Sequence, residues 1–450
     1  MALNKEELKR KACEAIEQRK PELLAVAKRI LENPETGFHE FKTSKLVAEE
    51  FTKRGISHKS GLALTGVKGW IEGGAGPGPR VSIIGELDSL LVPEHSTSDP
   101  TTGAAHACGH HCQIGMMLGA LAGLQAPEVL SQLSGRIVPF AVPAEEFVQV
   151  EKRMALRDEK RIEFLSGKQE LIRLGEFDDV DMAIMCHTAS DLGKKSFAVG
   201  GTSNAHVVKY IQFLGKGAHA GGSPHVGINA LNAAAWSLMA IHANRETFPE
   251  SETVRIHGII NRGGESVSAV PSDIRLEWRV RSGSPEAVAK NSERVDRCFK
   301  AGAMAVGGRV KITNIPGYMP LKHDSTLQRL FKENAERVVG HESVLQMPST
   351  RNRGGSTDMG DLSQIMPACH PYTGGATGAG HSKEYTIKDY EAAVINPAKI
   401  MAMVAIDLLS EGAAGAKEAL SGWRASMTKE QYLSFQRERA REVEFDGGRE

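Results

Sequence analysis

Three short apolar runs, each followed by ionisable residues, mark the first half of the chain. The runs begin at Val81 (VSIIG), Ile137 (IVPFAV) and Met182 (MAIMC). Unbroken apolar runs of this length are typical of strands that are buried on both faces of a parallel sheet. The ionisable residues that follow them are Glu86 and Asp88, then Glu145 and Glu146, and then His187. Because open α/β sheets carry their sites at the carboxyl ends of strands, this pattern predicts an α/β domain with a site at that edge.

After about residue 204 the pattern changes to the alternation expected of a sheet with one covered face. Ile274, Leu276, Trp278 and Val280 alternate with polar residues. The predicted elements, in chain order, are a strand at 207–214, a helix at 228–243, strands at 254–260 and 274–280, a helix at 285–306 and a strand at 310–315. This βαββαβ order is the plan of a small ferredoxin-like domain.

Helical patterns flank these segments at both ends of the chain. Asn4 and Glu7 form a capping-box signature that opens a helical region reaching about residue 31, and further helices are expected at 43–54, 325–339 and 390–409. The sequence therefore predicts a larger mixed α/β domain, at 1–203 and 317–450, interrupted by an inserted domain at 204–316. The charged stretch 149–179 is expected to be a solvated helical excursion, and 411–450 a peripheral helical tail.

Composition narrows the class of protein. The chain has 450 residues, enough for more than one domain, and its 55 Lys and Arg residues equal its 55 Asp and Glu residues. That balance lacks the basic excess of a nucleic-acid-binding protein. We expect no membrane span, because uninterrupted apolar runs in the sequence are too short to cross a bilayer. The charged N-terminus lacks the apolar core of a signal peptide. The six scattered cysteines do not suggest a disulfide framework, so we expect a cytoplasmic protein with free thiols.

The segment HACGHHC, from His106 to Cys112, gathers thiol and imidazole groups. Cys108 and His110 are separated by a single glycine, and both are ligand types that zinc and similar divalent metals prefer. The alternative is a set of buried, hydrogen-bonded histidines without a metal. Further candidate ligands elsewhere in the chain weaken that alternative: Glu145, Glu146, His187, Asp358 and His381.

Two adjacent glutamates, Glu145 and Glu146, follow the second apolar run in the sequence PAEE. Most pairs of adjacent glutamates are solvent-exposed surface residues without a role in a site. At the end of a buried strand, however, neighbouring carboxylates are costly unless cations neutralise them. One glutamate can then bind a metal while the other serves as a general base. His381 lies in the glycine-rich loop GGATGAGHSKEY, where the backbone can come close to a bound group.

Together these motifs resemble those of one known family. In chain order they are NPETGFHE from Asn33, GELDSL from Gly85, HACGH from His106, PAEE from Pro143, CH from Cys186, GKGAHAGGSP from Gly215, GGSTDMGDLS from Gly354 and GHS from Gly380. The chain is similar to the aminoacylase, carboxypeptidase G and auxin-conjugate hydrolase family of cocatalytic metallopeptidases. Cys108 in HACGH is typical of the amidohydrolase branch, which includes hippurate and aminobenzoyl-glutamate hydrolases.

The resemblance implies a dinuclear metal site and an amide-cleaving reaction. Two divalent ions, zinc or manganese, would share Cys108, and Glu145 would be the general base and acid. Asp88 would support the metal cluster from behind. The full set of implied metal ligands is Cys108, His110, Glu146, His187 and His381.

The resemblance also implies that the inserted domain is a lid and the surface of a homodimer. His219, in GAHAGGSP, matches a histidine that reaches the partner subunit's active site and bonds the oxyanion. Three positions depart from the family, and the first is Gln113, which replaces the last histidine of the usual HACGHDGH motif. His111 replaces the usual aspartate after HACGH and is either an extra ligand or, as we favour, structural. Ser268 stands where an asparagine commonly helps to hold a substrate's carboxylate, which weakens the usual preference for amino-acid carboxylates.

The predicted function is hydrolysis of the amide bond in N-acyl amino acids, amino-acid conjugates or dipeptides by a metal-activated water. The expected partner is a small-molecule amide substrate, without nucleic acid or a membrane. A second hypothesis is a non-catalytic member of the same fold that binds a metal or ligand, for which loss of the general base is expected. A third, an unrelated zinc-stabilised structural protein, predicts compact CxxC spacing, which the chain lacks.

Overall fold

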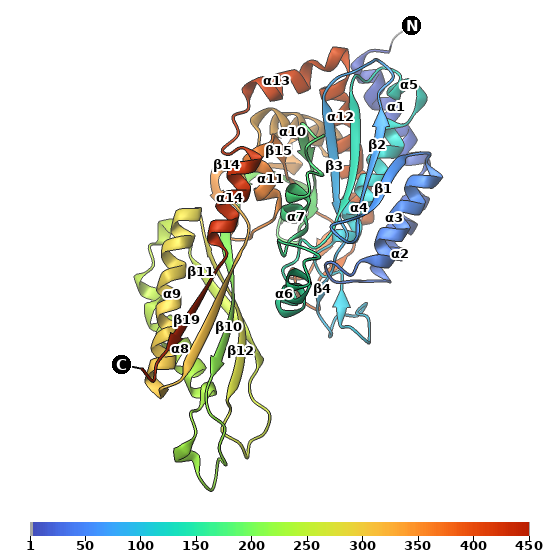
Figure 1. The fold of residues 1–450 in the computed structure, drawn as a ribbon. Helices are drawn as coiled ribbons and strands as arrows, with labels where there is room; N and C mark the ends of the chain where they lie inside the picture. The colour runs from blue at the N-terminus through green and yellow to red at the C-terminus, as the bar shows by residue number, and fades with distance from the viewer. Residues whose placement is uncertain (1–2, 450) are drawn as a thin grey trace.

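Two main β-sheets organise the chain (Figure 1). The computed structural model describes residues 3–449. The larger sheet has the strand order β1-β2-β6-β3-β7-β15, with bounds β1 Ser57–Leu62, β2 Gly66–Glu72, β3 Arg80–Glu86, β6 Arg136–Val142, β7 Met182–Ile184 and β15 Ala368–Cys369. Strands β6, β3, β7 and β15 run parallel, and β3 and β6 are buried along almost their whole length. The predicted apolar runs are therefore the central strands of a mixed α/β fold, as the sequence indicates.

Helices cover both faces of this sheet. On β6, Ile137 and Ala141 enter one apolar cluster while Val138 and Phe140 enter another, because successive side chains of a strand point to opposite faces. The first cluster contains α1 Lys5–Gln18, α2 Lys20–Leu31, α3 Phe41–Lys53, α4 His110–Leu124, α10 Ser325–Val339 and α12 Asn396–Leu409. The second contains α7 Gly167–Arg173, α11 Met359–Ile365 and α14 Lys429–Arg439.

The second main sheet belongs to what we call the smaller unit, residues 205–316 together with β19. Its elements are β10 Ala205–Leu214, α8 Ala230–Asn244, β11 Arg255–Arg262, β12 Asp273–Ser282, α9 Pro285–Val306 and β13 Arg309–Pro316. All strands pair antiparallel, in the order β11-β12-β10-β13-β19. The predicted βαββαβ order is found, and the apolar residues of β12 pack with those of α8 and α9.

The expectation of a peripheral helical tail is wrong in one respect. After α13 Ala414–Gly422 and α14, the segment Arg441–Asp446 forms β19, which pairs with β13 at the edge of the smaller unit (Figure 1). Val443 and Phe445 pack against the apolar cluster of that unit, which explains the pairing. The end of the chain therefore completes a sheet that begins far earlier in the sequence.

The expectation of a solvated helical excursion at 149–179 holds for its helices and is wrong for several of its charged residues. The stretch contains α6 Val150–Asp158 and α7, and several of its charged residues are buried. Arg153 is 1% exposed and donates to the carbonyls of Leu165, at 2.8 Å, and Glu146. Lys168 is 0% exposed. These two charges are satisfied by internal partners instead of water, whereas other charged residues of the stretch, such as Lys152, are exposed.

Shorter elements complete the structure near the ends of the central strands. A four-stranded sheet has the order β14-β9-β16-β8. The remaining bounds are β4 Leu90–Leu91, β5 Ala104–Ala105, α5 Pro127–Leu130, β8 His187–Thr188, β9 Phe197–Thr202, β14 Val344–Asn352, β16 Tyr372–Thr373, β17 Ala376–Thr377 and β18 Thr386–Ile387. Strand β8 begins at His187, one of the predicted ligands.

The helix Glu391–Leu409 has the length and composition of a membrane span, contrary to the sequence expectation. It consists of a π-helical turn, Glu391–Ile395, followed by α12. However, 83% of its most apolar window is buried within the protein, where it packs against α4, α1 and α10. Burial of this kind is characteristic of the core helix of a globular protein. The length and composition of this helix are therefore only weak evidence that it crosses a membrane.

Candidate metal centre and active site

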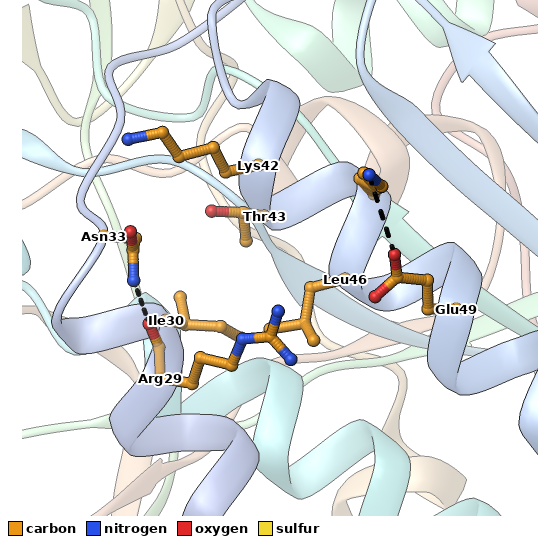
Figure 2. Close-up of a pocket in the computed structure, with 8 residues that line it drawn as sticks. Arg29, Ile30, Asn33, Lys42, Thr43, Leu46 and Glu49 are labelled. Atoms are coloured by element: carbon orange, nitrogen blue, oxygen red, sulfur yellow. Dashed lines mark hydrogen bonds and ion pairs between the residues drawn. The ribbon is translucent and has the colours of Figure 1, made fainter.

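Two hollows of the surface have contrasting linings. A hollow of about 250 Å³ between α2 and α3 has one carboxylate, that of Glu49, and neither histidine nor cysteine (Figure 2). On its wall the Asn33 amide donates to the Arg29 carbonyl at 2.9 Å. A second cleft, of about 490 Å³, brings together Cys108, Glu145, Glu146, His187 and His381. The second cleft is therefore the candidate site.

The turn that presents Cys108 and His110 depends on the glycine between them. Gly109 has φ 92°, in the left-handed region, and it immediately precedes α4, which begins at His110. A β-carbon at position 109 would lie 2.1 Å from the hydroxyl oxygen of Thr188. The turn places the Cys108 Sγ atom 3.4 Å from Nε2 of His187. The HACGH motif thus sets a thiol against an imidazole that is distant in sequence.

Asp88 lies behind His110 and Glu146. Its backbone carbonyl and Oδ1 atom lie 2.9 and 3.2 Å from Nδ1 of His110, and its Oδ2 atom accepts from the Glu146 N–H at 2.8 Å. These acceptors favour the tautomer of His110 that carries its proton on Nδ1, which leaves Nε2 free to bind a metal.

The PAEE segment turns sharply after β6. Ala144 has φ 54°, and its N–H donates to Oε1 of Glu40 at 2.7 Å, which holds the turn in this conformation. The Tyr318 hydroxyl donates to the Glu145 carbonyl. Both glutamate side chains are buried, and Oε1 of Glu146 lies 3.3 Å from Nε2 of His381. The turn therefore directs both carboxylates into the candidate site.

The potential ligand atoms form overlapping groups of three. Within each group all ligand atoms lie within 4.8 Å of one another, and the groups are Cys108–His110–His187, Cys108–Glu146–His381 and Glu86–His110–Glu145. The first two groups contain all five predicted ligands and share Cys108. Thiolate, imidazole and carboxylate donors suit zinc, and three protein ligands for each ion leave a position open for water or substrate, as in catalytic sites. The donor set fits two ions that share a thiolate.

The ionised forms of Glu145 and Cys108 are unfavourable without cations. Burial, together with Glu86 and Glu146, raises the pKa of Glu145 well above its usual value. Burial and Glu146 also raise the pKa of the Cys108 thiol. Both shifts show that the metal-free site resists ionisation of Glu145 and Cys108, whereas His381 and His110 lower the pKa of Glu146. Divalent cations would stabilise the thiolate and carboxylate forms that ligation and base catalysis require.

The sequence did not reveal the role of Lys168. Its Nζ atom lies 2.5 Å from Oε1 of Glu86 and 2.5 Å from Oδ1 of Asp358. Burial opposes ionisation, but Asp358 and Glu86 outweigh it and raise the pKa of Lys168. Oε2 of Glu86 in turn lies 3.1 Å from Nε2 of His110. Asp358, a candidate ligand by sequence, is thus an ion-pair partner, and Glu86 belongs to the third ligand group.

Two other predicted residues lie apart from the ligand groups. His111 is buried, its Nε2 atom lies 3.4 Å from Cys112 Sγ, and it belongs to none of the three groups. His219 is exposed and does not line the cleft of its own chain. Its Nδ1 atom accepts from the N–H groups of Gly221 and Gly222 at 3.2 and 3.0 Å.

A cleft with two ligand groups joined by one thiol, beside paired glutamates, defines a site of the dinuclear metallohydrolase type. Residues 83–404 match Peptidase family M20/M25/M40, and the chain belongs to this family. The predicted family and the predicted class of enzyme, a hydrolase of amide bonds, are confirmed.

The chain has similar relatives among characterised proteins. It is 27% identical over 423 residues to an Xaa-Arg dipeptidase of Mus musculus, covering 89% of each chain. It is 26% identical over 366 residues to an IAA-amino acid hydrolase of Arabidopsis thaliana, covering 78% of this chain and 77% of the relative. A solved aminobenzoyl-glutamate utilization protein of Klebsiella pneumoniae shares the fold, with a TM-score of 0.65, 20% identity, and coverage of 89% of this chain and 99% of that one.

Proposed function

We propose that this chain is a metal-dependent amidohydrolase that cleaves N-acyl amino acids, amino-acid conjugates or dipeptides. The observation that carries the proposal is the pair of ligand groups sharing Cys108 beside the buried Glu145. Relatives named as an Xaa-Arg dipeptidase, an IAA-amino acid hydrolase and an N-acetyl-L-cysteine deacetylase support this range of amides. The alternative of a non-catalytic member is disfavoured because the candidate base is present.

The cofactor would be two divalent ions, zinc or manganese, held by Cys108, His110, Glu146, His187 and His381. When bound, such ions polarise the amide carbonyl and lower the pKa of water. Glu145 takes the proton from the attacking water and delivers it to the leaving nitrogen. The buried position of Glu145 suits this role, because a base near the reacting atoms and away from bulk water keeps its proton within the site.

The metal requirement can be tested directly. Purified protein should contain about two divalent ions per chain, as a two-metal mechanism requires. A chelator should abolish hydrolysis of a panel of N-acyl amino acids and dipeptides, and added zinc or manganese should restore it. Elemental analysis and the hydrolysis panel measure these effects. Active protein without a transition metal would refute the proposal.

We also propose a homodimer formed through the smaller unit, which would then act as the lid. Trp236 and Met239 on α8 are 60% and 64% exposed, and Ile259 on β11 is 61% exposed. Strand β11 is an edge strand of its sheet, and an exposed apolar edge favours pairing with another chain.

We propose the cytoplasm as the location of the protein. The cysteines, including Cys108, are free, and the reducing cytoplasm keeps thiols in this form.

In this dimer, His219 of each chain would complete the partner's site. His219→Ala should lower turnover by about a hundredfold to a thousandfold, the typical effect of losing one oxyanion donor. The decisive measurement mixes His219→Ala chains with Glu145→Gln chains. Hybrid dimers should regain part of the activity, because one of their two sites then has both groups intact. If chains exchange and no activity returns, His219 does not act across the dimer.

A further inference from the structure

Four basic residues form a block on one face of the smaller sheet. Arg255 and His257 lie on β11, and Arg279 and Arg281 lie on β12. The strand register places Arg255 opposite Arg281 and His257 opposite Arg279. Residues directly opposite in an antiparallel pair have β-carbons roughly 5 Å apart, and like charges in such positions are destabilising. The facing arginines Arg255 and Arg281 are therefore an unfavourable pair unless an anion lies beside them.

This basic block faces the candidate site. The intervening residues of β12, such as Trp278 and Val280, enter the apolar cluster beneath α8 and α9, so Arg279 and Arg281 point to the opposite face. All four basic residues line the same cleft as the metal-ligand groups. A substrate with its amide at the ligand groups would therefore extend towards the block.

The arginines of the block have no acidic partner. Within residues 3–449, no carboxylate oxygen lies within 4.0 Å of Arg255, Arg279 or Arg281. Arg281 donates to the Ser356 hydroxyl at 3.0 Å and to Nε2 of His257 at 3.3 Å, and Arg279 donates to a backbone carbonyl at 2.5 Å.

Arg275 provides the contrast on the same strand and face. It pairs with Asp273 at 3.0 Å and also with Glu151. It does not line the cleft. The unpaired arginines are therefore specific to the cleft and are not a general property of β12.

The electrostatics of the block agree with this description. Burial and Arg279 lower the pKa of Arg281 to about 10. Burial and Arg281 lower the pKa of His257 to about 4. Both shifts reflect a positive field, in which Arg281 is still charged at neutral pH while His257 is neutral and accepts the hydrogen bond from Arg281. Glu145 and Glu146 oppose this field, but cations at the ligand groups would neutralise them and leave the arginines uncompensated.

We propose that the substrate carries two carboxylates besides its amide bond, and that Arg255, Arg279 and Arg281 bind them. The planar guanidinium fork matches a carboxylate in geometry as well as charge. Residues 279 and 281 lie about 7 Å apart along the strand, a spacing suited to the two carboxylates of an acidic amino acid. This inference rests on the proposed function and narrows its substrate to dianionic amides.

The test compares matched substrates with metal-loaded protein. The kcat/KM for N-benzoyl-L-glutamate should exceed that for N-benzoyl-L-glutamine by about tenfold to a hundredfold, the value of one hydrogen-bonded charge. A second comparison, of the kcat/KM values for N-succinyl-L-alanine and N-butyryl-L-alanine, tests whether the second carboxylate lies in the acyl half of the substrate instead. Arg279→Gln, and Arg255→Gln at an exposed position, should bring the preferred ratio towards one. Arg275→Gln is the matched control and should preserve the ratio.

The outcomes separate this inference from the proposed function. If the protein hydrolyses amides but neither pair shows a preference for the dianion, or N-benzoyl-L-arginine is the best substrate, the inference is wrong and the proposed function stands. If no amide is hydrolysed, calorimetry with glutarate and butyrate decides. Tighter binding of glutarate that is lost in Arg279→Gln supports the dianion site, whereas equal affinities overturn it.

Discussion

Replacing Glu145 by glutamine should lower turnover by roughly a hundredfold to ten-thousandfold, the usual contribution of a positioned general base. Glutamine keeps the shape of the side chain but cannot accept the proton of the attacking water. Glu145 belongs to none of the ligand groups that contain Cys108, so both ions should remain bound. Steady-state kinetics and metal analysis of the same sample measure the two effects.

Glu146→Gln is the matched comparison at the neighbouring position. Its carboxylate belongs to a ligand group with Cys108 and His381, so its loss should reduce metal content first, with activity partly restored by excess metal. If Glu145→Gln kept near-normal turnover with its metals bound, the assignment of the base would be wrong.

Replacing Lys168 by methionine should lower the free energy of unfolding of the part of the protein that contains the larger sheet by about 3–5 kcal/mol, the usual effect of removing one partner from a buried ion pair. The substitution leaves two buried carboxylates, those of Glu86 and Asp358, without their shared cation. Urea unfolding followed by tryptophan fluorescence should show an earlier transition.

Two variants control this prediction. Lys152→Met changes an exposed lysine of the same charged stretch and should leave the transition in place. Adding Asp358→Asn to Lys168→Met removes one of the unpaired charges and should recover part of the lost stability. An unchanged transition in Lys168→Met would show that the ion pair contributes nothing to the fold.

The fold could be predicted where local pattern and burial coincide. The runs at Val81 and Ile137 are apolar throughout because both faces of their strands are covered, and this signal is visible in the sequence. The alternation of β12 likewise reflects one covered face. The candidate ligands could be chosen because cysteine, histidine and paired glutamates follow these strands, and the structure brings all five into adjoining groups.

Other features depend on partners that are distant in sequence. Lys168 lies in a stretch rich in charge, and only its contacts with Glu86 and Asp358, 82 and 190 residues away, distinguish it from a solvated lysine. The basic block is equally difficult to predict from the sequence, because its basic residues become neighbours only when β11 pairs with β12 in the observed register. The edge strand β19 has two apolar residues in six, too weak a signal to identify a strand.

Strand β19 has a consequence for how the protein is made. The smaller unit begins at residue 205, but its sheet is complete only when Arg441–Asp446 has paired with β13. Domains generally fold as units while the ribosome is still adding residues. Here the outer edge of β13 stays unpaired while the ribosome adds residues 317–440, and it can close only after Arg441–Asp446 has been made. Until then the edge is exposed to pairing with a strand of a neighbouring nascent chain, and the pairing of β19 removes that possibility.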